Sequence, residues 1–143
     1  MYLMSDKKDS LRVTFGLIDQ TRTGSGLAIR VEARVSGYAH EADYWVTEAD
    51  FRRFVEKLQQ LSVALVVGEA SIEGENSKNS FALSIQSDPK YRGYLFIRTA
   101  IDHQVGYVGF LTARNHFDGG FYSEPANLPE WLEELTGILE KAV

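Results

Sequence analysis

The spacing of apolar residues is the feature that most constrains this chain, because its period changes three times along the 143 residues. Apolar and polar residues first alternate over residues 11–17 and 27–35, and a shorter stretch, "GYAHEADYWV", ends in Trp45 and Val46. Alternation with a period of two predicts strands that bury one face. The intervening "DQTRTGSG" is rich in turn-forming residues, so the first two strands are predicted to form a hairpin.

At Thr47 the period becomes helical. Thr47 is a good N-cap, and Asp50 follows three residues later as a short capping-box partner. Apolar residues then recur at spacings of three and four: Phe51, Phe54, Val55, Leu58 and Leu61. They form a single stripe, so we expect an amphipathic helix that buries this stripe and turns its charged residues to solvent.

Strand patterns return over residues 81–85, 95–101 and 105–113, separated by turn-rich clusters that include "DHQ" and "RNHFDGG". A second helix is predicted from Asn127, a good N-cap, with Pro129 in its first turn. The order strands, helix, strands, helix predicts an α+β fold, with a mainly antiparallel sheet or sandwich and two amphipathic helices. We expect a single globular domain over residues 11–143, after a flexible N-terminal segment at residues 1–10.

Composition narrows the classes of function. The chain has no cysteine, which excludes disulfides, thiolate zinc sites and a cysteine nucleophile. Its formal net charge is −5 and it has no basic stripe, so we expect no nucleic-acid partner. The sequence has no apolar run of about 20 residues and no apolar core of a signal peptide near its start. We therefore expect no membrane partner and a cytoplasmic location.

The three histidines do not form a recognisable metal site. His103 and His116 stand in "DHQ" and "RNHFDGG", which predicts turns at the two ends of a strand roughly 30 Å long. Ligands of one metal ion must converge to about 2.1 Å from it, so these two histidines are not expected to share an ion. His40 would meet either of them only through the tertiary fold. We expect neither a metal nor a cofactor.

Signatures of catalysis are missing from the sequence. It contains no G-x-S-x-G, no G-x-x-x-x-G-K-[ST], and no G-x-G-x-x-G that opens a helix after a strand. Glu32, inside a predicted strand, is the carboxylate best placed for acid–base chemistry, although an ion pair with Arg30 or Arg34 is the simpler role. We predict no catalytic residue. A small enzyme or a ligand-binding domain with a carboxylate-lined cleft remains the alternative.

Two surfaces are candidates for binding a protein. If the apolar strand faces pack on the helices, the opposite face carries arginine and aromatic side chains, which are enriched at interfaces. Phe96 on that face needs cover, from the remaining strands as in a sandwich, or from a partner. The candidate partner-binding residues are Arg30, Arg34, Tyr94, Phe96 and Arg98. The alternative is an acidic surface on the last helix, formed by Glu130, Glu133 and Glu134, which would suit a basic partner. The sequence leaves open whether the chain also forms a homo-oligomer.

Three stretches determine the order of the predicted strands and helices: "LAIRVEARVSGYAHEADYWVTEADFRRFVEKLQQL", "FALSIQSDPKYRGYLFIRTAI" and "NLPEWLEELTGIL". This order, in which a tryptophan-ended strand leads into a helix and further strands lead to a closing helix, resembles the bacterial Wap-type immunity protein family and related small domains. The resemblance covers most of the chain from Leu11 onward. It implies a non-enzymatic protein that neutralises a cognate toxin by binding it in the cytoplasm of the producing bacterium. It carries no functional residue onto a numbered position of this chain.

Overall fold

The structure is a computed structural model that describes residues 1–5, 10–19, 26–35, 38–63, 67–76, 79–108 and 111–141. Its elements follow in the order β1 (Tyr2–Ser5), β2 (Ser10–Asp19), β3 (Gly26–Val35), β4 (Tyr38–Thr47), α1 (Glu48–Val63), β5 (Gly68–Glu75), β6 (Ser80–Ser87), η1 (Pro89–Tyr91), β7 (Leu95–Val108), β8 (Leu111–Ser123), η2 (Pro125–Asn127) and α2 (Leu128–Lys141). The predicted order of strands, helix, strands and helix is confirmed, and the class is α+β.

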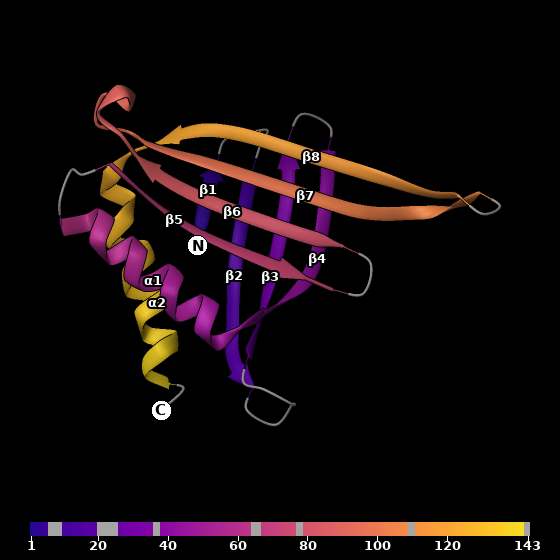
Figure 1. Cartoon of the computed structure of the whole chain (residues 1–143), viewed down its shortest axis with the longest axis horizontal. Coiled ribbons are helices and arrows are strands. Elements are labelled where there is room, and N and C mark those ends of the chain that lie inside the picture. The colour runs from indigo at the N-terminus through magenta and orange to yellow at the C-terminus, as the bar shows by residue number, and fades with distance from the viewer. Residues whose placement is uncertain are drawn as a thin grey trace.

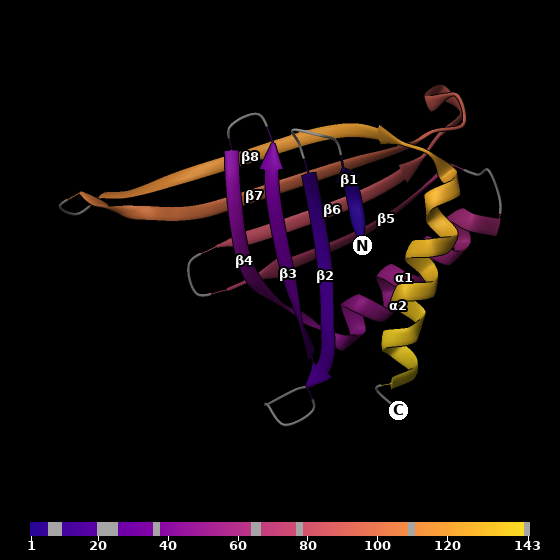
Figure 2. The same ribbon diagram turned by 180° about the vertical axis from the view of Figure 1, so that it is seen from behind.

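The described strands form one antiparallel sheet whose spatial order follows the chain from β1 to β8. Among the described residues, β4 and β5 are paired only at Trp45 and Glu75. The sheet folds over at this junction. Figures 1 and 2 show that β1–β4 lie on one side of the molecule and that β5–β8 run crosswise over the other side. We call β1–β4 the first half and β5–β8 the second half of the sheet.

The apolar faces of the two halves turn toward each other and belong to one continuous core. At the fold, the rings of Tyr44 and Phe81 lie with their centroids 5.6 Å apart. Gly74 on β5 is the register partner of Phe81, and β4 approaches it closely, since a Cβ at this position would lie 3.0 Å from the Cβ of Tyr44. We had expected the strands to bury their apolar faces against the helices. Instead the halves share a core, and the helices close its open side.

Helix α1 begins directly at the end of β4. The backbone N–H of Asp50 donates to Thr47 Oγ1 over 3.2 Å, which confirms the predicted N-cap. The predicted stripe is buried; within it, Phe51 and Phe54 lie 5.2 and 6.2 Å from the ring of Phe15 on β2. Helix α2 packs against α1 and β2, so that both helices lie on one flank (Figure 1). Neither described helix is long and apolar enough to span a membrane.

Two clusters that we predicted to be turns lie inside strands. β7 runs through "DHQ" and β8 runs through "RNHFDGG". Asp102 pairs with His116, and His103 pairs with Asn115. The two histidines are therefore neighbours in the register, and their predicted placement at opposite ends of a strand is wrong. Pairing between β7 and β8 outweighs the turn propensity of these residues. The two strands form a long hairpin, which continues past the start of β6 as a two-stranded arm (Figure 1).

Two further strands were not expected from the sequence. β5 turns only Ala70, Ile72 and Gly74 inward, so its apolar pattern is too weak to identify a strand. Residues 2–5 belong to the segment that we predicted to be flexible, and they form β1, which pairs with β2. Met1 beside β1 is buried and belongs to the core.

Phe54→Ala should lower the free energy of unfolding by about 3–5 kcal/mol, because truncating a fully buried phenylalanine leaves a cavity in the core. The neighbouring Arg53 is exposed and pairs with Asp50 on the same helix, so Arg53→Ala should cost less than about 1 kcal/mol. Denaturant titrations of both variants measure the difference. Equal, small losses would contradict the burial of this stripe.

Gly26→Ala should destabilise the first half by about 1–3 kcal/mol, the usual cost of overpacking. Its Cβ would lie 2.3 Å from Trp45 Cζ2 and 2.7 Å from the carbonyl oxygen of Val46. Gly137 in α2 is the matched control because an added Cβ meets nothing within 4 Å there. Gly137→Ala should stabilise the protein by about 0.5–1 kcal/mol through its higher helix propensity. Opposite shifts in melting temperature are expected, and shifts of the same sign would be inconsistent with this packing.

Candidate functional site

The five residues predicted to share a partner-binding face lie on three parts of the molecule. Arg30 and Arg34 are exposed on the outer side of β3, in the first half, whereas Phe96 and Arg98 lie on the outer side of β7, in the second half. Because the halves face each other, these outer sides point in opposite directions (Figures 1 and 2). Tyr94 precedes β7 and lines a separate hollow of about 360 Å³ near the start of α2. The prediction of one shared face is wrong, because it assumed a single layer of strands.

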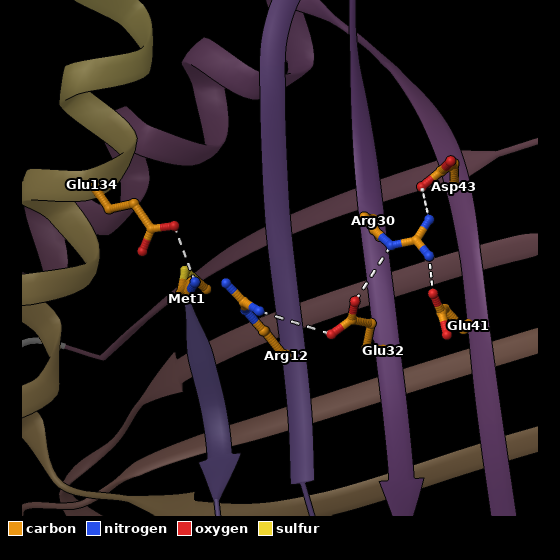
Figure 3. Close-up of polar contacts among 7 residues, drawn as sticks. All are labelled: Met1, Arg12, Arg30, Glu32, Glu41, Asp43 and Glu134. Carbon is orange, nitrogen blue, oxygen red and sulfur yellow. Dashed lines mark hydrogen bonds and ion pairs between the residues drawn. The ribbon is translucent and has the colours of Figure 1, made fainter.

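The outer side of the first half is occupied by its own ion pairs (Figure 3). Arg30 donates to Asp43 over 3.0 Å and to Glu32 over 3.3 Å, and it also pairs with Glu41. The hydrogen bond to Asp43 raises the pKa of Arg30. Glu32 lies 4.0 Å from Arg12 as well, so the predicted ion-pair role of Glu32 is confirmed. These groups pair with one another across the strands, although Glu41 and Asp43 remain largely exposed.

The acidic surface predicted on α2 is partly used within the chain. Glu130 and Glu133 are exposed. Glu134 accepts a hydrogen bond of 3.0 Å from the amino group of Met1 (Figure 3). The three carboxylates therefore do not act as one open acidic patch.

The side chains on the outer side of the second half form a regular array, and we call this surface the β5–β8 outer face. The register places one outward residue of each strand directly opposite the next, in four rows. Row one is Glu69, Gln86, Phe96 and Tyr122; row two is Ser71, Ser84, Arg98 and Gly120; row three is Glu73, Ala82, Ala100 and Asp118; row four is Glu75, Ser80, Asp102 and His116. The rows therefore run from an aromatic end to an acidic end.

An aromatic trio of Tyr91, Phe96 and Tyr122 marks the first end. The centroid of the Phe96 ring lies 5.5 Å from that of Tyr91 and 5.4 Å from that of Tyr122, and the two tyrosine rings are 5.8 Å apart. Phe96 also covers Gly120, where a Cβ would lie 2.5 Å from Phe96 Cζ. Tyr91, Tyr122 and Gly120 thus lie against Phe96 within the chain. The sequence had predicted cover from the opposite strands of a sandwich or from a partner. Tyr122 stays 61% exposed.

Arg98 is the single lysine or arginine in the four rows. Its Nε and Nη2 donate to the two carboxylate oxygens of Asp118 over 3.1 and 2.8 Å. Hydrogen bonding from Arg98 is the main cause that lowers the pKa of Asp118, and the charge of Arg98 and nearby His116 act in the same direction. These two parallel hydrogen bonds orient the guanidinium of Arg98 and the carboxylate of Asp118 toward each other on the sheet.

The acidic end of the outer face is hollowed. A recess of about 520 Å³ there is lined by residues that include Trp45, Asp50, Glu73, Glu75, Asp102 and His116. This recess is the kind of carboxylate-lined cleft on which the alternative function depends. Among the described residues, no group of three or more histidines and carboxylates is arranged to hold a metal ion.

The other histidines lie elsewhere. His40 Nε2 is 2.6 Å from the hydroxyl of Tyr44. The side chain of His103 lies outside the described part of the structure. Sequence reasoning missed Tyr91, Tyr122 and the carboxylates of β5, since each stands in a segment predicted to be a turn or assigned no element.

Comparison of the chain with models of known protein families, with curated proteins and with solved structures finds no match in any of the three. The comparisons therefore assign this chain neither a family nor a function.

Asp118→Asn should remove a small stabilisation that depends on pH. A carboxyl whose pKa is lowered in the folded state stabilises the fold above its unfolded pKa of about 3.9, and this stabilisation is lost as the pH falls through the lower folded value. The stability difference between wild type and Asp118→Asn should therefore be present at neutral pH and shrink in acid. Urea titrations at several pH values measure it.

The same substitution in an Arg98→Gln background is the control for this ion pair. There the difference should depend much less on pH, because the group that contributes most to lowering the pKa of Asp118 is gone. An undiminished pH dependence in that background would contradict the assigned cause.

Proposed function

We propose that this protein is a non-enzymatic protein-binding module that contacts its partner through the β5–β8 outer face, with the aromatic trio as its anchor. The observation that carries the proposal is the exposure of Tyr122, 61%, beside two rings that it contacts. Exposed aromatic side chains that are already held in place offer a large apolar area at a low entropic cost of binding.

The surroundings of the trio support this role. Tyr91 donates its hydroxyl hydrogen to Gln86 Oε1 over 3.1 Å, which ties η1 to row one of the array. Gly120 leaves room for Phe96 to lie on the sheet. Arg98 stands one row away with its guanidinium oriented by Asp118. An aromatic centre beside oriented polar groups is the usual composition of a protein interface.

Immunity to a toxin is the specific form of binding that we propose, on the strength of the family resemblance in the order of the predicted strands and helices. An immunity protein of this kind needs a rigid complementary surface and no reactive group. Of the partner-binding residues predicted from the sequence, Phe96 and Arg98 belong to the proposed surface. Arg30 and Arg34 belong to the opposite side, and Tyr94 belongs to neither.

A ligand-binding domain or small enzyme is the second candidate, favoured by the carboxylate-lined recess at the acidic end. Glu73 and Glu75 in that recess are exposed. Electrostatic catalysis depends on groups held in a site that excludes water. The openness of these carboxylates is the reason that we place binding of a protein first.

Tyr122→Ala should weaken the complex with the protein encoded next to this chain's gene by about 30-fold or more, the effect of removing an interface hot spot. Purified proteins and isothermal titration calorimetry give the affinity. The matched control is Arg30→Ala with Arg34→Ala, on the opposite side, which should leave the affinity within about twofold.

Three outcomes would count against this proposal. The absence of any complex with that neighbour would remove the toxin-immunity form. An unchanged affinity for Tyr122→Ala would remove the aromatic trio as the anchor. A loss confined to the double arginine variant would move the binding surface to the first half of the sheet.

A further inference from the structure

Two hollows adjoin each other on the β5–β8 outer face, and we call them together the trough. The recess at the acidic end and a second hollow of about 280 Å³ share Glu73, Ala82 and Ala100 in their linings. The second hollow reaches Gln86 in row one, beside the aromatic trio. Three steps of two residues each along the strands give the trough a length of about 20 Å, which about six residues of extended chain would span.

Most side chains in the middle of this trough are small. Rows two and three carry Ser71, Ser84, Gly120, Ala82 and Ala100, and their longer members are Glu73 on β5 and the paired Arg98 and Asp118 on β7 and β8. Aromatic groups stand at its two ends, the aromatic trio at one and Trp45 at the other. A surface of this shape receives a chain laid along it better than a flat or convex partner.

Within the part of the chain that the structure describes, the four rows carry more negative than positive charge. The four rows hold five carboxylates, namely Glu69, Glu73, Glu75, Asp102 and Asp118. Their single guanidinium, Arg98, is already paired with Asp118. The outer side of the first half differs, because Arg12 and Arg30 there pair with the carboxylates around them. An excess of negative charge of this kind accelerates the association of a partner with the opposite charge.

We infer that the trough receives an extended, basic segment of the partner protein. This inference rests on the proposed function and adds the chemistry of the partner. Lysine or arginine side chains of the segment meet Glu73 and Glu75, next to the ring of Trp45, because aromatic rings attract cations. An apolar or aromatic side chain farther along the segment covers the aromatic trio. Phosphate-bearing partners are repelled by the same carboxylates.

An octalysine peptide is a suitable probe because it carries the proposed charge and no other feature. Titrated at low ionic strength into protein labelled with ¹⁵N, it should shift amide signals of the trough, among them those of Glu73, Ser80, Ala82 and Asp102. Glu73→Gln with Glu75→Gln should weaken this binding about fivefold or more, as the loss of two surface charge contacts implies.

The matched control is Glu130→Gln with Glu133→Gln, which makes the same change of charge on exposed positions of α2. This variant should alter the affinity for octalysine less than about twofold. Circular dichroism checks that each variant is folded, and Glu75→Gln alone replaces the trough variant if the pair disturbs the sheet. Equal weakening by both double variants, or amide shifts centred on α2, would overturn the inference, since either result would assign the binding to net charge alone.

A small polyamine is the other source of the same chemistry. Spermine that binds the trough as tightly as octalysine would show a pocket for amines rather than a docking surface for a segment, and would also overturn the inference. Spermine binding that is at least about tenfold weaker supports it, because the longer peptide contacts more of the trough at once.

The test separates this inference from the proposed function. Tyr122→Ala lies at the aromatic end and should leave the affinity for octalysine within about twofold. If octalysine fails to bind the trough while Tyr122→Ala still breaks the partner complex, only the basic segment is wrong. If octalysine binds as expected and Tyr122→Ala leaves the partner complex intact, the aromatic anchor of the proposed function fails instead.

Discussion

The shared core is the main interaction that holds the two halves of the sheet together, because among the described residues the strands β4 and β5 pair only at Trp45 and Glu75. Ladder hydrogen bonds cannot fix the angle between halves that are paired at one position. Contact between Tyr44 and Phe81 beside Gly74 sets the approach at the fold. Helix α1 then fills the open side, where Phe51 and Phe54 meet Phe15. The existence of two outer sides that point in opposite directions follows from this packing.

Local signals predicted the helices well, and non-local pairing explains where prediction from the sequence failed. The N-cap at Thr47 and the apolar stripe of α1 depend on residues within a few turns of each other, so the sequence contains all that determines them. The strands through "DHQ" and "RNHFDGG" depend on pairing between Asp102 and His116 in a long hairpin. Residues typical of turns tolerate such a strand when a partner is aligned with them, and no local pattern reveals that alignment.

The candidate site was predicted only in part for the same reason. Phe96 and Arg98 were selected by residue type, which is informative at interfaces. They were grouped wrongly with Arg30 and Arg34. The alternation of apolar and polar residues shows which side of a strand a residue lies on, but not how the two halves of the sheet are placed relative to each other. Tyr122 could have been found if the alternation of Phe117, Gly119 and Phe121 had been continued through the double glycine, since it then falls on the opposite, outward side.

The contrast between the two outer sides suggests a division of roles within one sheet. In the first half, Arg30 is surrounded by carboxylates of its own and neighbouring strands, so its charge is used inside the molecule. In the second half, the carboxylates of β5 stand apart from Arg98, which is engaged with Asp118. Both sides are built on strands whose register fixes the spacing of their side chains, which gives a binding surface geometric accuracy without loops. The two outer sides therefore differ in their pattern of charge although one shared core supports both of them.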